Sequence, residues 1–230
     1  MQNILIVAAH PDDELLGCGG TVARHIDDGD KVFFLIMAEG ATARDNNRNS
    51  GTHIKAEKLF DSCRKVSKYL GAEEPVFGKL FDNRMDSYDF LDIVKIIENF
   101  SSKIQPSVVY THHGNDLNID HQITHRAVLT ALRPVPENKV ESVFAFETLS
   151  SSEWSSKQQG ASFVPQHYVE ITKYLEKKIN ALKIYEEEIK EFPHPRSIAG
   201  VKALAQYRGS TVGVHAAEAY EIIYNIKKLK

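Results

Sequence analysis

The chain has 230 residues, of which 42% are hydrophobic, so that it can bury one large core. Its 28 basic and 31 acidic side chains give a formal net charge of -3, which provides no basic surface for nucleic acid and favours a small-molecule substrate. Two cysteines without a CxxC pair, and the lack of a secretory signal or a membrane-length apolar run, predict a cytoplasmic protein that contacts no membrane.

Short β-rich runs alternate with longer helical patterns over about residues 1–150, which is typical of βαβ units. The β-rich runs are almost continuously apolar, as expected for strands that are covered on both faces. The sequence therefore predicts an α/β fold, a three-layer αβα sandwich with a mainly parallel sheet. Strands are predicted at 3–9, 31–38, 75–78, 107–111 and 141–147, and crossover helices at 15–26, 56–70, 90–100 and from 121 onward.

The pattern changes after about residue 150. A serine-rich loop is followed by a predicted strand at 168–172 and by a long charged helix from about 173 to 190. No repeat or low-complexity linker marks a domain boundary. We therefore expect a single domain over 1–230, in which 1–150 is the catalytic part and 151–230 is a C-terminal helical extension that closes the pocket.

The first predicted strand runs directly into His10-Pro11-Asp12-Asp13-Glu14. In open α/β sheets the loops at the carboxyl ends of the strands form the ligand crevice. Three carboxylates packed there are unfavourable unless a cation or a helix N-terminus neutralises them. Because zinc prefers histidine nitrogen with carboxylate oxygen, and a catalytic site leaves one position for water, His10 and Asp13 are candidate ligands.

A second polar segment, residues 111–121, follows the fourth predicted strand and contains three histidines. His121 opens the next helix and can supply a third ligand. His112 and His113 are neighbours at the strand end, so at most one of them is expected to face the site. His125 lies one helical turn after His121, and we favour a supporting or packed role for it over a role as ligand.

Ala9-His10-Pro11-Asp12-Asp13-Glu14 after an apolar strand, followed by Asp120-His121 at the start of a later helix, resembles the PIG-L/LmbE-like family of zinc-dependent N-deacetylases. The resemblance covers the Rossmann-like part, about residues 1–150, and extends more weakly to 208–210 and 217–219. It implies that His10, Asp13 and His121 bind zinc and that Asp12 is the general base. It also implies an amino-sugar substrate.

Many members of that family have a histidine three residues before the third zinc ligand, where this chain has Asn118. An asparagine can donate a hydrogen bond to an oxyanion but cannot shuttle a proton near neutral pH. Either His112 or His113 takes over the acid role, or Asp12 alone carries the proton from water to the leaving amine. The candidate catalytic residues are therefore Asp12, Asn118, His112 and His113.

Other strand ends supply candidate substrate contacts. Residues 41–51 include Arg44 and Asn49, and residues 82–86 include Asp82 and Arg84. Such amide, guanidinium and carboxylate groups suit a hydroxyl-rich ligand such as a sugar, and arginine suits an attached phosphate. Arg208 and the segment 193–197 either close the pocket or lie on the surface.

The expected function is removal of an N-acetyl or other short acyl group from an amino sugar or sugar conjugate by zinc-activated water. Three alternatives are a metal- or sugar-binding protein without turnover, a non-heme Fe(II) enzyme, and hydrolysis of a phosphoester or a formamide. The ion is then Zn²⁺, or alternatively Fe²⁺ or another divalent cation. In a fourth alternative, residues 12–14 simply cap the first helix. The sequence leaves open whether the chain forms a homo-oligomer.

Overall fold

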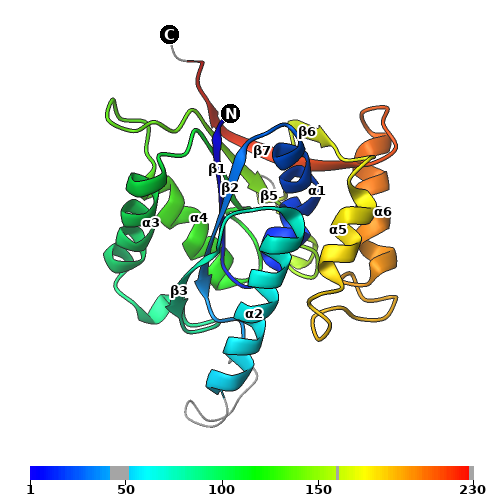
Figure 1. Cartoon of the computed structure of the whole chain (residues 1–230), viewed down its shortest axis with the longest axis horizontal. Helices are drawn as coiled ribbons and strands as arrows, with labels where there is room; N and C mark the ends of the chain where they lie inside the picture. Colours follow the sequence, from blue (N-terminus) through cyan, green and yellow to red (C-terminus); the bar gives the residue numbers. More distant parts are fainter. Residues whose placement is uncertain (42–51, 159–160, 228–230) are drawn as a thin grey trace.

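The computed structural model describes residues 1–41, 52–158 and 161–227. Within them, seven strands form one sheet in the order β3-β2-β1-β4-β5-β7-β6 (Figure 1). Five adjacent strands are parallel: β1 Asn3–Ala8, β2 Lys31–Ala38, β3 Val76–Leu80, β4 Val108–His112 and β5 Ser142–Phe146. The strand β7 Ala217–Asn225 pairs antiparallel with β5, and β6 His167–Glu170 pairs antiparallel with β7.

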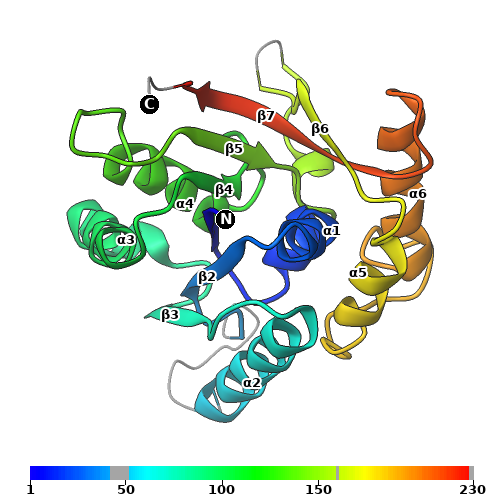
Figure 2. The same ribbon diagram turned by 45° about the horizontal axis from the view of Figure 1, so that its top comes forward.

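Helices cover both faces of this sheet (Figure 2). On one face lie α1 Asp13–Asp27, α2 Thr52–Leu70 and α5 Leu175–Leu182, and on the other lie α3 Phe90–Ile104 and α4 Ile119–Ala131. The helix α6 Ile198–Ser210 packs beside α5 and β7, and two 3-10 turns, η1 Met85–Ser87 and η2 Ser152–Trp154, complete the elements. The predicted three-layer α/β sandwich with a mainly parallel sheet is therefore confirmed.

The two cores follow from the alternation of side chains along the strands. In β1, Ile4 and Ile6 belong to the core under α1, α2 and α5, whereas Leu5 and Val7 belong to the core under α3 and α4. All four are fully buried, and burial of each such side chain contributes about 1.5–3 kcal/mol. The central strands are thus apolar on both faces, which explains why their pattern is continuous.

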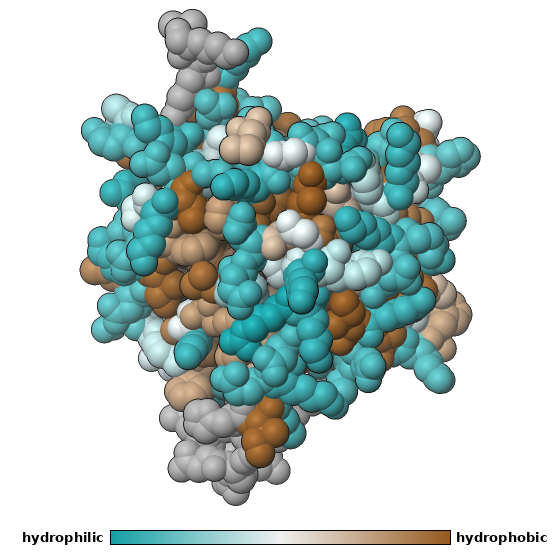
Figure 3. Space-filling model, viewed as in Figure 1, coloured by the Kyte–Doolittle hydropathy of each residue, from teal (hydrophilic) through white to brown (hydrophobic). Residues whose placement is uncertain are grey.

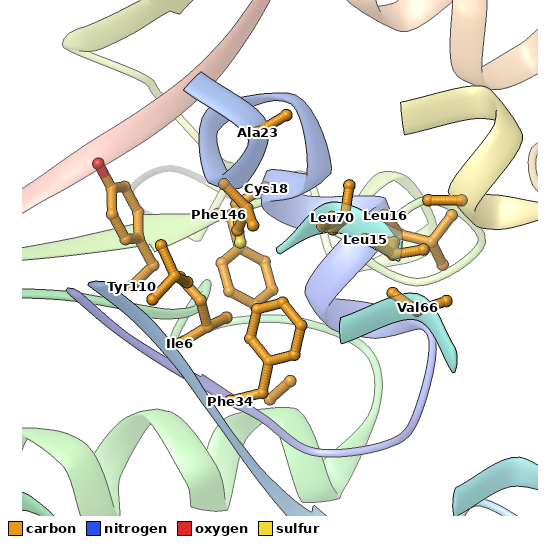
Figure 4. Packing of buried hydrophobic residues seen from close by; sticks show 14 of the residues in the cluster. Ile6, Leu15, Leu16, Cys18, Ala23, Phe34, Val66, Leu70, Tyr110 and Phe146 are labelled. Carbon is orange, nitrogen blue, oxygen red and sulfur yellow. The ribbon is translucent and has the colours of Figure 1, made fainter. Parts of the chain in front are cut away.

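The helix α1 lies very close to the sheet. Figure 4 shows Leu15 and Cys18 of α1 packed with Phe34 and Phe146 of the strands below. A Cβ atom at Gly17 would stand 2.2 Å from the ring of Phe146, so only glycine permits this approach. An alanine at this position would force the helix away from the sheet.

The C-terminal part differs from its prediction in two ways. The helix expected over 173–190 ends at Leu182, because three successive glutamates, 186–188, would stand at the negative end of the helix dipole. The buried Tyr185 follows in a turn instead. The extension also adds two strands to the sheet: β6 matches the strand predicted at 168–172, whereas β7 was not predicted.

The face of the molecule drawn in Figure 3 carries mostly polar residues. Figure 3 shows a largely hydrophilic face, on which the larger hydrophobic groups lie on the side of α3 and α4. Among the helices that the structure describes, none has the length and apolar character that a bilayer crossing requires.

Candidate metal centre and its cavity

The turn between β1 and α1 places four ionisable side chains at the carboxyl edge of the sheet. Its backbone is held in an unusual conformation at Asp12, whose φ of 108° lies in the left-handed region that side chains disfavour. The carboxylate of Glu14 accepts the Asp12 N–H at 2.9 Å, and the Asp12 carbonyl accepts the N–H groups of Leu15 and Leu16. These bonds hold the turn so that His10 and Asp13 point towards the same volume.

His10, Asp13 and His121 meet at this edge of the sheet. Their ligand atoms all lie within 4.8 Å of one another, and all three residues are buried. The Oδ2 atom of Asp13 lies 3.2 Å from His10 Nδ1 and 3.1 Å from His121 Nε2. The turn after β1 and the first helical turn of α4 thus bring together the three predicted ligands.

The cluster has buried polar atoms that need a partner. Among the described residues, Asp13 Oδ1 has no hydrogen-bond partner, and the ring nitrogens of His121 lie 3.0 Å from Asp116 and 3.1 Å from Asp13 without the alignment of a hydrogen bond. Each such buried atom costs about 1–3 kcal/mol. A divalent cation between these side chains would satisfy His121 Nε2 and the Asp13 carboxylate. Two nitrogens and one carboxylate oxygen are a donor set that zinc accepts, so the residues present fit this ion.

The opposite side of the His10 ring contacts two more carboxylates. His10 Nε2 lies 3.0 Å from Asp120 Oδ2 and 3.2 Å from Asp82 Oδ1, and these three residues form a second group that could hold an ion. However, both oxygens of Asp120 already accept N–H groups, from Asn83 at 2.6 Å and from Met85 at 3.0 Å. We therefore interpret Asp82 and Asp120 as the residues that hold the His10 ring with Nδ1 turned towards Asp13.

A cavity of about 310 Å³ opens beside His10. Its lining from the first part of the chain includes Asp12, Asp82 and Asn118. Glu187, Glu188 and Arg196 line it from the C-terminal part.

Asp12 turns towards this cavity rather than towards the helix. It stands at the N-cap position of α1, but its side chain makes no capping hydrogen bond. Its Oδ2 atom instead accepts a hydrogen bond from Arg196 Nη1 at 2.8 Å. Burial raises the pKa of the Asp12 carboxyl well above its usual value, and the charge of Arg196 opposes this increase. The alternative that Asp12 caps α1 is therefore wrong.

His112 packs against the ring of His121. The Ala9 N–H donates to His112 Nε2 at 2.8 Å, so Nδ1 carries the proton and donates to Thr148 at 3.2 Å. Burial lowers the pKa of His112 well below its usual value, which keeps the ring neutral. The ring stacks on His121 with a centroid distance of 3.9 Å. Both of its nitrogens are thus bonded away from the cavity.

His113 points away from the cluster, as the alternation along β4 requires. Its Nδ1 lies 2.7 Å from Glu221 Oε2, and its Nε2 lies 3.1 Å from the Ala161 carbonyl. His125 bonds the His112 carbonyl through Nδ1 at 2.7 Å, which is a supporting contact. None of these three histidines is among the described residues that line the cavity.

The remaining predicted site residues lie in different places. Asn118 lines the cavity and accepts the Asp120 N–H through Oδ1 at 2.8 Å, so its Nδ2 lies on the other side of the amide. Arg84 stands at the N-cap position before η1, outside the described lining. Arg208 forms two 2.7 Å hydrogen bonds with Glu147 and is likewise outside that lining. Arg44 and Asn49 lie outside the described residues.

Sequence reasoning left the role of Arg196 open and gave none to Asp116. The carboxylate of Asp116 lies 3.0 Å from His121 Nδ1 and accepts hydrogen bonds from Ser151 and Ser152. Burial raises the pKa of Asp116, but these contacts outweigh burial and lower it. The only sequence signal for Asp116 was its place in the polar segment after β4, and for Arg196 its place after a Pro-His-Pro turn.

Comparison with known proteins agrees with this geometry. A family model described as PIG-L: GlcNAc-PI de-N-acetylase matches residues 5–132. The uncharacterized deacetylase YaiS of Escherichia coli is 30% identical over 187 residues, which are 79% of this chain and 89% of that protein. The chain belongs to the PIG-L family, and the resemblance predicted from its motifs is confirmed.

Solved structures share the architecture. N,N'-diacetylchitobiose deacetylase from Pyrococcus horikoshii superposes with a TM-score of 0.76 at 17% identity, over 97% of this chain and 84% of that one. GalB, the 4-carboxy-2-hydroxymuconate hydratase from Pseudomonas putida, has a TM-score of 0.76 at 19% identity, over 100% and 99% of the chains. At these identities the likeness shows the fold alone. One fold thus serves a deacetylase and a hydratase, so the activity must be argued from the site.

Proposed function

We propose that this chain is a metal-dependent N-deacetylase that hydrolyses the amide of an N-acetylated amino sugar or a related small molecule. The observation that carries the proposal is the placement of three ligand atoms within 4.8 Å of one another, with the carboxylate of Asp12 beside them in a cavity. Membership of the PIG-L family supports the reaction class. The name of a relative from Thermococcus kodakarensis, diacetylchitobiose deacetylase, supports the sugar substrate; it is 20% identical over 98% of this chain and 85% of that protein.

His10, Asp13 and His121 would hold the cation, for which we propose zinc. Bound there, it would supply Lewis-acid catalysis and lower the pKa of water at the site. Asp82 and Asp120 hold the His10 ring, and Asp116 and His112 contact the ring of His121. These contacts keep the ligand atoms in place before the substrate arrives.

Asp12 acts as the general base in this proposal. Arg196 bonds its Oδ2, which leaves Oδ1 to take a proton from a water molecule in the cavity. The water oxygen bonds to the acyl carbon, and Asn118 Nδ2 donates a hydrogen bond to the carbonyl oxygen as charge develops there. The C–N bond then breaks, and the products are a carboxylate and a free amine.

The proton of the leaving amine comes from Asp12 itself. His112 and His113 were candidates for this role, but each has both ring nitrogens bonded to protein atoms outside the described cavity lining. Asp12 acquires a proton in the first step and is the group that lies beside the reacting atoms. We therefore propose that Asp12 returns the same proton to the nitrogen of the leaving amine, so that the proton taken from water is the one that the amine receives.

The substrate class follows from the described lining, in which carboxylates and amides predominate. Asp82, Asn83 and Asn118 offer acceptors and donors that suit sugar hydroxyl groups. The contacts predicted for Arg44 and Asn49 stay predictions. The two cysteines, Cys18 and Cys63, are both free and buried, which supports a reducing compartment, and we propose the cytoplasm.

The test is acetate release from N-acetylated sugars, free and conjugated, by the protein with its native metal and after chelation. Asp12→Asn is expected to keep the bound metal and to lower kcat by about 1000-fold, because the base is lost. Asp86→Asn removes an exposed carboxylate and is the matched control. If wild type binds sugar and metal but releases no acetate, the chain is a binding protein without turnover. Oxygen consumption with bound iron would instead favour the Fe(II) alternative.

A further inference from the structure

The guanidinium group of Arg196 makes three contacts through two of its nitrogens. Nη1 donates to Asp12 Oδ2 at 2.8 Å, and Nε donates to Ser150 Oγ at 2.7 Å. Nη1 also lies 3.5 Å from Glu188 Oε2. The planar group is thereby fixed in one orientation, with Asp12 on its inner side.

This contact fixes only one oxygen of the carboxylate. Among the residues that the structure describes, Arg196 is the only side chain that hydrogen-bonds the Asp12 carboxylate, and it does so at Oδ2. The contact therefore selects a rotamer of Asp12 and leaves Oδ1 to the cavity.

The backbone of Asp12 is held from the same part of the chain. The hydroxyl of Tyr185 donates to Glu14 Oε1 at 2.6 Å, and Glu14 Oε2 accepts the Asp12 N–H at 2.9 Å. Tyr185 and Glu14 are both buried. Two residues of the C-terminal part, Tyr185 and Arg196, thus hold one residue of the first turn by separate routes.

The ion pair contributes little to folding. The side chain of Arg196 is 21% exposed and that of Asp12 only 5%, so that both charges lose much of their hydration. The desolvation cost of such a pair offsets most of its Coulomb attraction. Stability therefore gives no sufficient reason for an arginine at this position, and the orientation of Asp12 gives one.

We propose that Arg196 is a positioning residue, which holds Oδ2 of Asp12 so that Oδ1 meets the attacking water. The proposal rests on the proposed function, in which Asp12 is the base. Arg196 acts through Asp12 and does not bind the substrate. Its loss is therefore expected to change the rate of the chemical step and not the affinity for the sugar.

The kinetic test compares wild type with Arg196→Gln and Arg196→Lys on the N-acetylated sugar that wild type hydrolyses. Arg196→Gln is expected to lower kcat by about 100-fold, with KM within about threefold and bound metal unchanged. Arg196→Lys keeps the charge but cannot bond Asp12 and Ser150 at the same time. Its kcat should therefore lie between that of wild type and that of Arg196→Gln. Lys202→Gln, which removes a surface ion pair with Glu176 on the same part of the chain, is the control and should match wild type. An unchanged kcat, or a raised KM at constant kcat, overturns the proposal.

A second readout does not depend on activity. A crystal structure of metal-free Arg196→Gln is expected to show the Asp12 carboxylate in another rotamer, whereas metal-free Lys202→Gln should keep it. An Asp12 rotamer identical to that of wild type overturns the proposal, even where kcat falls. If wild type hydrolyses no substrate, the proposed function fails, and the rotamer still decides whether Arg196 positions Asp12. If Arg196→Gln does not fold, Arg196→Met, whose side chain cannot donate a hydrogen bond to Asp12, is used for the same structural comparison.

Discussion

Two buried clusters of charge touch α1, and they are satisfied in different ways. At the start of the helix, the ligand cluster of His10, Asp13 and His121 contains buried atoms without a hydrogen-bond partner among the described residues. Further along the helix, Lys178 and Glu218 form an ion pair at 2.6 Å, with exposures of 3% and 5%. In the first cluster, buried polar atoms thus lack protein partners, whereas in the second the protein itself supplies the partners.

The Lys178–Glu218 pair also satisfies backbone groups of α1 where the helix is interrupted. The helix is non-helical at Cys18, so its second half begins with N–H groups that lack helical partners. Glu218 accepts two of these, from Gly20 at 2.9 Å and from Thr21 at 2.7 Å. Lys178 balances this carboxylate and also bonds the Leu16 carbonyl at 2.9 Å. A buried charged cluster in which every polar atom has a partner indicates a structural role. A buried cluster with unpartnered polar atoms indicates a binding site.

Asp13→Asn gives the largest expected effect on the ligand cluster. It keeps the shape of the side chain but removes the charged ligand, so cation affinity should fall by about 1000-fold. The melting temperature of the metal-free protein should change by less than about 3 °C, since the amide oxygen can still accept the His10 N–H that Asp13 Oδ2 accepts at 3.0 Å. Metal analysis and calorimetry of chelated protein measure the two quantities. Asp28→Asn, at the exposed end of the same helix, is the control. A metal-replete Asp13→Asn protein would remove the distinction between the clusters.

Lys178→Met should produce the reverse result. It leaves the Glu218 carboxylate buried without its cation, which costs about 3 kcal/mol of unfolding free energy. Metal content should equal that of wild type. Urea denaturation measures the loss, and the double variant Lys178→Met with Glu218→Gln should recover part of it because the buried charge is gone. A stable single variant would show that the pair is dispensable to the fold.

Asp120→Asn tests the supporting residues of the ligand cluster. The amide can no longer hold the His10 ring as a carboxylate does, so metal affinity should fall by about 10- to 100-fold. We expect a smaller effect than for Asp13 because Asp120 is proposed to hold the His10 ring rather than to bind the ion. Competition with a chelator measures the affinity, with exposed Asp89→Asn as the control. An effect as large as that of Asp13→Asn would mean that Asp120 is itself a ligand.

His113→Gln should have the smallest effect, and one that depends on pH. Burial lowers the pKa of His113, but its hydrogen bond and ionic attraction to Glu221 outweigh burial and raise the pKa above its usual value. The pair therefore stabilises the fold fully below about pH 6.5 and loses this effect as pH rises through the raised pKa. The substitution should cost about 1.5 kcal/mol near pH 5.5 and clearly less near pH 9.5, by urea denaturation. A cost that is equal at both pH values would contradict the ion pair.

The sequence predicted the parts of the molecule that depend on local pattern. The strands β1 and β2 are apolar throughout because both faces are covered, and their ends could be placed within a residue. His10, Asp13 and His121 could be brought together as candidate ligands because parallel strands deliver their following loops to one edge. The motif at residues 9–14 then identified the family.

The parts that were missed depend on contacts between distant segments. The strand β7 carries Glu218 and Glu221 among its apolar residues, so its pattern does not resemble that of a buried strand. Glu218 is nevertheless buried, because α1 supplies its partners. The contact of Arg196 with Asp12 likewise joins two turns that no local pattern relates. Neither β7 nor this contact can be predicted from the sequence pattern alone, because both depend on the three-dimensional packing.

The strand β7 lies between β5 and β6 in the sheet, although it follows both along the chain. As the protein emerges from the ribosome, β6 is therefore made before the strand that it pairs with. The candidate ligands His10, Asp13 and His121 precede β5, whereas Tyr185 and Arg196 lie between β6 and β7. Arg196 can therefore contact Asp12 only after the candidate ligands have been made, and β7 completes the sheet last.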